Sequence, residues 1–170
     1  MKRDSRLSGV LHVLLHMAEA DVPLTSEALA NMMKTNPVVV RRVLAGLREQ
    51  KLVCSEKGHG GGWKICRDLA DVTLHDVYIA LNEPTLLAMG NRTESPGCLV
   101  EEAVNAALNQ TFADAEALLL ARFRSVTLAQ LSLDFHQRMQ ARGFSGIHEH
   151  SIFPHDEADS PTQTDISPER

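Results

Sequence analysis

Three arginines are spaced along one short stretch of the chain in a way that suits binding to an anion. Arg41, Arg42 and Arg48 lie within residues 37–49, and a guanidinium group can pair with phosphate or with the edge of guanine through two parallel hydrogen bonds. The apolar residues of the same stretch recur three and four positions apart, as they do on one face of a helix: Val40, Val43, Leu44 and Leu47. The sequence therefore predicts a helix with a packed face and a cationic face.

The residues around Asn36 mark where this helix begins. Asn36 is a favoured N-cap, and Pro37 suits the first helical position, where its missing amide proton costs nothing. Thr35, Asn36 and Val38 would then lie where the start of such a helix reaches base edges and thymine methyl groups, with Arg41 and Arg42 contacting guanine or phosphate.

A second helix is predicted just upstream, within residues 24–33, capped by Thr25. Lys34 and Thr35 form the turn between the two helices. A short turn between two helices, the second of them cationic, is typical of a helix-turn-helix, which places its second helix in the major groove of DNA.

Two apolar runs separated by glycines follow this helix pair. Residues 52–54 and 63–66 suit short strands, and residues 58–62 suit the turn of a hairpin, or wing. His59, Gly60 and Gly61 at its tip would approach the minor groove. A hairpin centred on residues 59–61 would pair Cys54 with Ile65 and Cys66 with Val53, which places the two cysteines on opposite faces and predicts no disulfide between them.

The charge distribution favours DNA as the partner. Residues 1–67 contain 11 Lys and Arg against 6 Asp and Glu, although the whole chain has a net charge of −5. Local charge matters most, because phosphate neutralisation supplies most non-specific affinity for DNA. The main alternative is a winged-helix module that docks proteins. An enzyme is not expected, since no phosphate-binding loop, nucleophile elbow or HExxH motif is present.

The composition indicates where the protein is located and whether it holds a metal. The chain of 170 residues has no apolar run of 18 residues and no signal-peptide pattern, so a cytoplasmic protein without a membrane contact is expected. Three cysteines do not suggest a disulfide framework. His12 and His16 have a spacing that could bind a metal, but exposed or boundary histidines are the better interpretation, and no metal site is predicted.

The remaining chain is expected to hold the oligomer contacts. A long helix is predicted over residues 98–124, and its apolar stripe is longer than a small winged domain can cover. A second copy of the chain is the simplest cover, which predicts a homodimer. The predicted division is a winged helix-turn-helix over 1–82, a loop over 83–97, the dimerisation helix and a terminal helix over 98–142, and an acidic, disordered tail over 143–170. The tail could weaken non-specific DNA binding or simply aid solubility.

Taken together, residues 7–81 resemble the Rrf2 family of bacterial transcription regulators. The resemblance rests on the opening helix, LTSEALA, TNPVVVRRVLAGL, the wing at 58–63 and VTLHDVYIAL, and it continues more weakly through the long helix and VTLAQL. It implies a mainly α fold, a winged helix-turn-helix with a small β-hairpin and a long C-terminal dimerisation helix. It also implies a homodimer that binds a palindromic operator and usually acts as a repressor.

Many members of that family hold an iron–sulfur cluster through three cysteines in the loop before the long helix. Here only Cys98 matches, and the family's spacing places Arg92, Leu86 and Glu101 where other ligands would stand. No cofactor is therefore expected, because such a cluster needs about four ligands, mostly thiolates. The input could instead be thiol redox chemistry at Cys98, whose thiolate a helix N-terminus would favour, or a small-molecule effector bound near residues 83–97. A structural role for Cys98 is equally compatible with the sequence.

Overall fold

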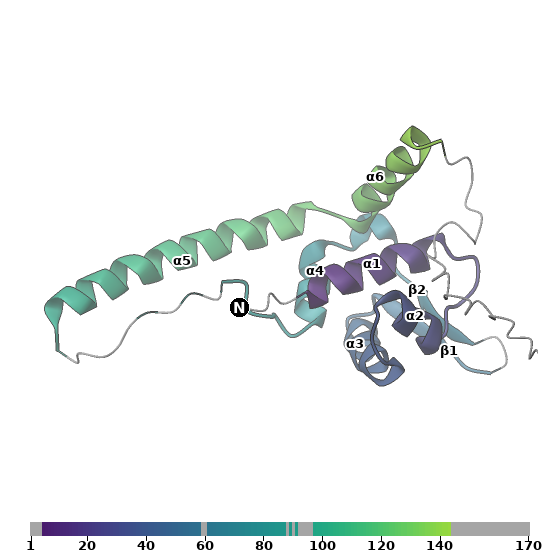
Figure 1. Cartoon of the computed structure of the whole chain (residues 1–170), viewed down its shortest axis with the longest axis horizontal. Helices are drawn as coiled ribbons and strands as arrows, with labels where there is room; N and C mark the ends of the chain where they lie inside the picture. Colours follow the sequence, from purple (N-terminus) through teal and green to yellow (C-terminus); the bar gives the residue numbers. More distant parts are fainter. Residues whose placement is uncertain (1–4, 59–60, 88, 90, 92–96, 144–170) are drawn as a thin grey trace, which may run out of the picture.

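The fold consists of six α-helices and one hairpin in the part of the chain that the structure describes (Figure 1). This computed structural model describes residues 5–58, 61–87, 89, 91 and 97–143. The elements in order are α1 (Arg6–Glu19), α2 (Ser26–Met32), α3 (Pro37–Glu49), β1 (Val53–Glu56), β2 (Gly62–Ile65), the 3₁₀ turn η1 (Leu69–Asp71), α4 (Leu74–Ala80), α5 (Leu99–Ser125) and α6 (Leu128–Ala141). The predicted mainly α fold with a small hairpin is confirmed.

One hydrophobic core holds α1 to α4 and the hairpin together, and we call this unit the head. Leu14 of α1, Leu29 of α2, and Leu44 and Leu47 of α3 are fully buried in it. The helical period of the sequence therefore identified the packed face of α3 correctly. Truncating such a leucine to alanine typically costs 2–5 kcal/mol, so this core determines how firmly α3 is held.

The turn between α2 and α3 is built from local hydrogen bonds. The Thr25 hydroxyl accepts from the Ala28 amide at 3.1 Å, and the Asn36 carboxamide oxygen accepts from the Val38 amide at 2.7 Å. Between them Lys34 adopts a left-handed backbone with φ 49°, and its amide donates to the Asn31 carbonyl at 3.1 Å. These bonds confirm both predicted caps and set the direction of α3.

Gly46 gives a sharp test of how α3 packs on α4. A Cβ atom at Gly46 would lie 2.5 Å from the backbone carbonyl oxygen of Ala80. We expect Gly46→Ala to lower the free energy of unfolding by about 2 kcal/mol, because backbone must move to admit the methyl group. Gly9→Ala in α1 is the matched control, since its Cβ would meet only the flexible end of Met33 at 3.6 Å.

The control should raise the free energy of unfolding by roughly 0.5–1 kcal/mol through helix propensity. Urea denaturation followed by circular dichroism measures both variants. Equal effects of the two substitutions would contradict the close approach of α3 to α4.

The hairpin register differs from the sequence prediction by one residue. Val53 pairs with Ile65 and Cys54 with Lys64, so the predicted pairing of Cys54 with Ile65 is wrong. A shift of one residue moves every side chain to the other face, which places Cys54 and Cys66 on the same face, where they form a disulfide. The prediction that these cysteines cannot be bonded is therefore also wrong.

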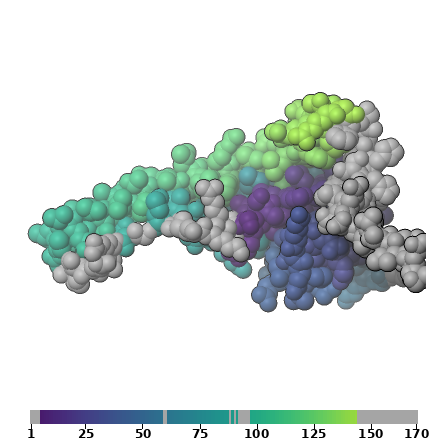
Figure 2. Space-filling model, viewed as in Figure 1, coloured from purple at the N-terminus to yellow at the C-terminus, as the bar shows by residue number. Residues whose placement is uncertain are grey.

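α5 extends away from the head and contacts it only near its C-terminal end (Figures 1 and 2). There Phe123 meets Tyr78 of α4 edge to face, with ring centroids 6.0 Å apart. At 1.5 Å per residue the 27 residues of α5 span about 40 Å, so most of the helix lies beyond the head. No helix within the described ranges is long and apolar enough to cross a membrane.

The chain then returns to the head through α6. Leu128, at the start of α6, is 1% exposed and belongs to the core of the head. Its amide donates to the Val72 carbonyl at 2.8 Å, and Thr73 forms a bridge with Thr127. Both threonines cap their helices with a capping box. The C-terminal end of α5 and the start of α6 are thus both attached to the head.

Candidate nucleic-acid interface

The outward face of α3 carries both charge and exposed apolar groups. Arg41 and Arg42 are exposed, and Val38 and Val39 at the start of the helix are 60% and 45% exposed. Neither valine belongs to the buried core, and the exposed methyl groups suit contact with thymine methyls. The sequence analysis did not identify Val39 as a contact residue. Its position outside the apolar repeat that includes Val40 could have shown that it faces outward.

The two adjacent arginines differ in their partners. The Arg41 guanidinium donates to the Glu27 carboxylate of α2 at 2.7 Å, and both side chains are more than half exposed. An exposed pair of this kind stabilises a protein by less than about 1 kcal/mol, so phosphate could replace Glu27 as the partner of Arg41. Arg42 forms no ion pair with any described residue, which leaves its guanidinium free to bind a ligand.

Arg48 connects α3 with the wing. Its guanidinium lies 5.9 Å from the centre of the Trp63 ring of β2, a cation–π contact. Arg48 is therefore a packing residue as well as a surface charge. The sequence analysis identified its charge but missed this partner, because the contact depends on how the hairpin folds back on α3.

The three residues predicted to contact DNA at the start of α3 differ in how accessible they are. Asn36 is exposed, but its side-chain oxygen already accepts from the Val38 and Val39 amides, at 2.7 and 3.3 Å. Its amide group remains able to donate to a base or a phosphate. Thr35 is half-buried, and its backbone amide donates to the Ala30 carbonyl at 3.0 Å. Val38 is thus the most accessible of the three.

The wing lies beside α3, on the same side of the head as α2 (Figure 1). Gly58 has φ 102°, a left-handed conformation that favours glycine, and its carbonyl accepts from the Gly61 amide at 3.0 Å. Gly58 and Gly61 are thus the residues at the tip of the wing that the structure describes. His59 and Gly60, two of the predicted contact residues, lie outside the described residues, as do Lys2, Arg3 and the tail from 144 on.

Two histidines of α1 lie side by side on the surface of the head. The Nε2 atoms of His12 and His16 lie 2.7 Å apart. Burial lowers the pKa of His16 below its usual value, and the nearby His12 lowers it further, against the opposing effect of Glu19. These effects favour the neutral form of His16. The described residues contain no group of three or more metal-binding side chains.

The cysteines have two different environments. Cys98 is a free, exposed thiol at the N-cap of α5, and its side chain makes no capping hydrogen bond. Cys54 and Cys66 are bonded to each other at the base of the wing. A signal for this pair was present in the sequence: pairing apolar Val53 with apolar Ile65, so that both face the core, selects the register that brings the cysteines together.

An open cavity lies beside the hairpin. It measures about 640 Å³ and lies between the α1–α2 connection and the segment 64–69. Charged residues line part of it: Asp21, Glu56, Lys64, Arg67 and Asp68. The effector site predicted near residues 83–97 is a different region, so this cavity is an additional place where a small polar molecule could bind.

Comparison with known proteins places the chain among bacterial regulators. Residues 3–134 match the model of a family described as "Rrf2: Iron-dependent Transcriptional regulator". The "Putative HTH-type transcriptional regulator YwnA" of Bacillus subtilis is 33% identical over 109 residues, which cover 64% of this chain and 80% of that protein. No part of these matches concerns an enzyme.

Solved structures share the fold. A protein described as a "putative transcriptional regulator from Lactobacillus plantarum" has a TM-score of 0.65 at 23% identity, and the match covers 82% of this chain and 95% of that chain. IscR of T. potens has a TM-score of 0.57 at 16% identity, over 88% of this chain and 96% of its own. At these identities the likeness supports the fold, and the family model supports the role.

Proposed function

Because the chain belongs to the Rrf2 family of transcription regulators, we propose that it is a cytoplasmic repressor that binds a palindromic operator as a homodimer. The observation that carries the proposal is the free cationic and apolar face of α3 beside the wing. In a winged helix-turn-helix, that face enters the major groove while the wing approaches the minor groove.

Each predicted side chain would have a distinct role in the complex. Arg42 would bind guanine or phosphate directly, and Arg41 would do so after exchanging Glu27 for the nucleic acid. Val38 and Val39 would contact thymine methyls, and the Asn36 amide would donate to the DNA without breaking the cap. Thr35, and the wing residues His59, Gly60 and Gly61, complete the proposed interface.

The homodimer follows from the surface of α5. Val100 and Leu118 are 73% and 75% exposed, and Val104 and Leu108 are exposed between them along the helix. These four residues lie on one side of α5, since their spacings are four, four and ten residues. A second α5 related by twofold symmetry would cover this stripe, and the two heads would then address symmetric half-sites. In this division of the chain, residues 1–82 read DNA and α5 joins the protomers.

The input signal is proposed not to be an iron–sulfur cluster, even though the family description includes iron. A cluster needs about four ligands, mostly thiolates. The chain has three cysteines, of which Cys54 and Cys66 are bonded to each other and only Cys98 is a free thiol. These residues do not fit a cluster, so thiol redox chemistry or a small-molecule effector is the proposed input.

An electrophoretic mobility shift with the DNA upstream of its own gene tests the function. We expect a discrete complex whose dissociation constant is at least about 10³-fold lower than for unrelated DNA of equal length. The affinity should also fall steeply with salt concentration, because phosphate contacts release counterions. Equal affinity for both DNAs would instead favour the alternative, a winged-helix module that docks proteins.

A further inference from the structure

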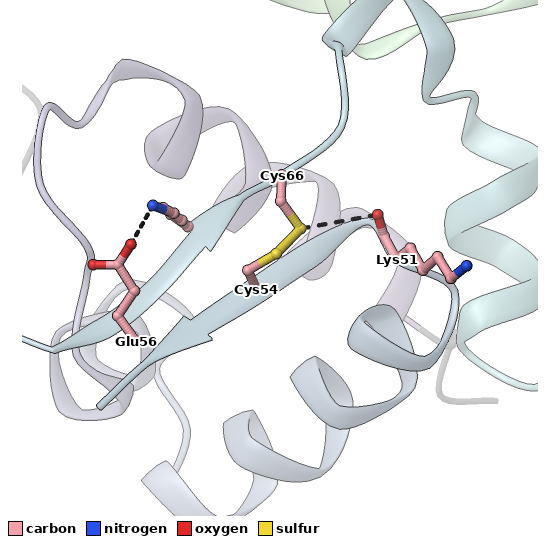
Figure 3. The surroundings of a disulfide bond; sticks show 5 residues. Lys51, Cys54, Glu56 and Cys66 are labelled. Carbon is pink, nitrogen blue, oxygen red and sulfur yellow. Dashed lines mark hydrogen bonds and ion pairs between the residues drawn. A yellow bond between two sulfur atoms is a disulfide. The ribbon is translucent and has the colours of Figure 1, made fainter.

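The disulfide lies on the exposed face of the wing, at the end nearest the helices (Figure 3). Cys54 is in β1 and Cys66 directly follows β2, with their Cα atoms 5.7 Å apart. Cys66 is exposed and Cys54 is half-buried. The same face carries the Glu56–Lys64 ion pair toward the tip of the hairpin. Small molecules in solution can therefore reach at least one of the two sulfurs.

The opposite face anchors the hairpin without help from the disulfide. Val53 is fully buried, and Ile65 packs against the same core. The backbones of Leu24 and Trp63 exchange two hydrogen bonds, of 2.8 and 2.9 Å, and the Trp63 indole donates to the Ser26 hydroxyl at 3.1 Å. Because these contacts remain when the sulfurs separate, we expect the reduced head to stay folded. A redox change at the cysteines then acts locally on the wing.

The disulfide also lies at the joint between α3 and the wing. α3 ends at Glu49, and Lys51 turns the chain into β1 with a left-handed φ of 57°. The Cys66 Sγ atom lies 4.0 Å from the Lys51 carbonyl oxygen, and the Cys66 amide donates to the Leu52 carbonyl at 3.2 Å. The cross-link therefore restrains the wing at the point where its angle to α3 is set.

We propose that Cys54 and Cys66 form a reversible dithiol–disulfide site that controls how tightly the head binds DNA. The inference deepens the proposed function and rests on it, since a cytoplasmic DNA-binding protein is kept in a reducing compartment. Disulfides there are usually transient and serve catalysis or sensing. The site thus supplies the thiol redox input that the sequence analysis considered only for Cys98.

The oxidant is a low-molecular-weight disulfide, and thiol exchange balances the reaction. The thiolate of exposed Cys66 attacks one sulfur of the oxidant, which forms a mixed disulfide and releases one thiol of the oxidant. The thiolate of Cys54 then attacks the Cys66 sulfur and releases the second thiol. Two electrons move from the cysteines to the oxidant, and the two protons of the cysteine thiols end on the released thiols. The reverse sequence with two small thiols reduces the site.

The disulfide form is the tighter DNA binder. A wing restrained at its base loses less conformational freedom on entering the minor groove, and rigidifying a binding element in its bound conformation raises affinity. With two wings in the dimer, we expect roughly a tenfold lower dissociation constant for the oxidised protein, which corresponds to about 1.4 kcal/mol.

The experiment compares full-length protein equilibrated with oxidised or reduced glutathione. Differential alkylation and mass spectrometry report the state of each cysteine, and fluorescence anisotropy with the upstream DNA reports affinity. The tenfold difference should vanish in Cys54→Ser and in Cys66→Ser, both of which should bind like the reduced protein. Cys98→Ser is the matched control and should keep the full difference. Circular dichroism verifies that each variant is folded.

Three results would overturn the proposal. The first is a failure of oxidised glutathione to form the Cys54–Cys66 disulfide, or a failure of reduced glutathione to reduce it. The second is equal, tight binding by both forms, which refutes the switch but leaves the DNA-binding function intact. The third is specific binding by neither form, which refutes the proposed function itself and with it the control of affinity.

Discussion

Leu108→Glu should convert the dimer into monomers and lower operator affinity by at least about 100-fold, because linked half-sites contribute 10²–10⁴ in avidity. Leu108 lies within the exposed stripe of α5 that includes Val104 four residues earlier. In the proposed dimer each substitution would bury an unpaired carboxylate against the partner helix, and the twofold axis places two such charges in one interface. An unpaired buried charge costs several kcal/mol, so two of them in one interface should shift the equilibrium toward monomers.

Ala113→Glu is the matched control for this prediction. Ala113 is exposed on the same helix, nine residues after Val104, which is about two and a half turns and therefore the opposite side of α5. The control adds an identical charge without entering the stripe, so it should remain dimeric and bind the operator normally. Sedimentation velocity measures the mass of each variant, and anisotropy measures affinity. A dimeric Leu108→Glu protein would show that the protomers associate through another surface.

Arg42→Ala should weaken operator binding by at least about 30-fold. The arginine would contact DNA once in each half-site, and the loss of a base or phosphate contact costs about 1–3 kcal/mol. Two losses of about 1 kcal/mol give this factor. Arg42 is a cleaner test than Arg41, because removing Arg41 also leaves Glu27 as an unpaired negative charge near the DNA.

The salt dependence separates a direct contact from a general loss of charge. If Arg42 neutralises a phosphate in each half-site, the slope of log K against log salt should become shallower by about 2. Arg138→Ala serves as the control, since it removes the same charge from α6, on the other side of the head from α3 (Figure 1). Affinity and slope should be unchanged there. Equal losses for Arg42→Ala and Arg138→Ala would mean that only net charge matters.

The boundaries of the helices could be predicted because local residues determine them. Thr25 and Asn36 cap α2 and α3 with their own side chains, and both were identified from the sequence alone. A cap involves donors and acceptors only two or three residues apart, so no knowledge of the remaining fold is needed. The cationic face of α3 was predicted correctly for a similar reason, because helical periodicity relates residues only three or four positions apart.

The hairpin shows why other features could not be predicted from local patterns. Its register depends on the pair Val53 and Ile65 entering a core formed by α1 and α3, and on the bridge from Leu24 to Trp63. These partners are distant in sequence, and a symmetric turn around residues 59–61 favoured the neighbouring register. The error of one residue exchanged the two faces of the wing and hid the Cys54–Cys66 bond.

The amino-acid sequence by itself determined the order of the helices, the caps that begin them, the cationic face of α3 and the surplus length of α5. These features follow from periodicity and short-range hydrogen bonds. Only the tertiary structure decided that Arg41 pairs with Glu27 while Arg42 pairs with no described residue, that Arg48 packs on Trp63, and that Cys54 meets Cys66 at the base of the wing. Each of these contacts joins residues brought together by burial of the common core, and side-chain types and spacing along the chain do not specify such pairs.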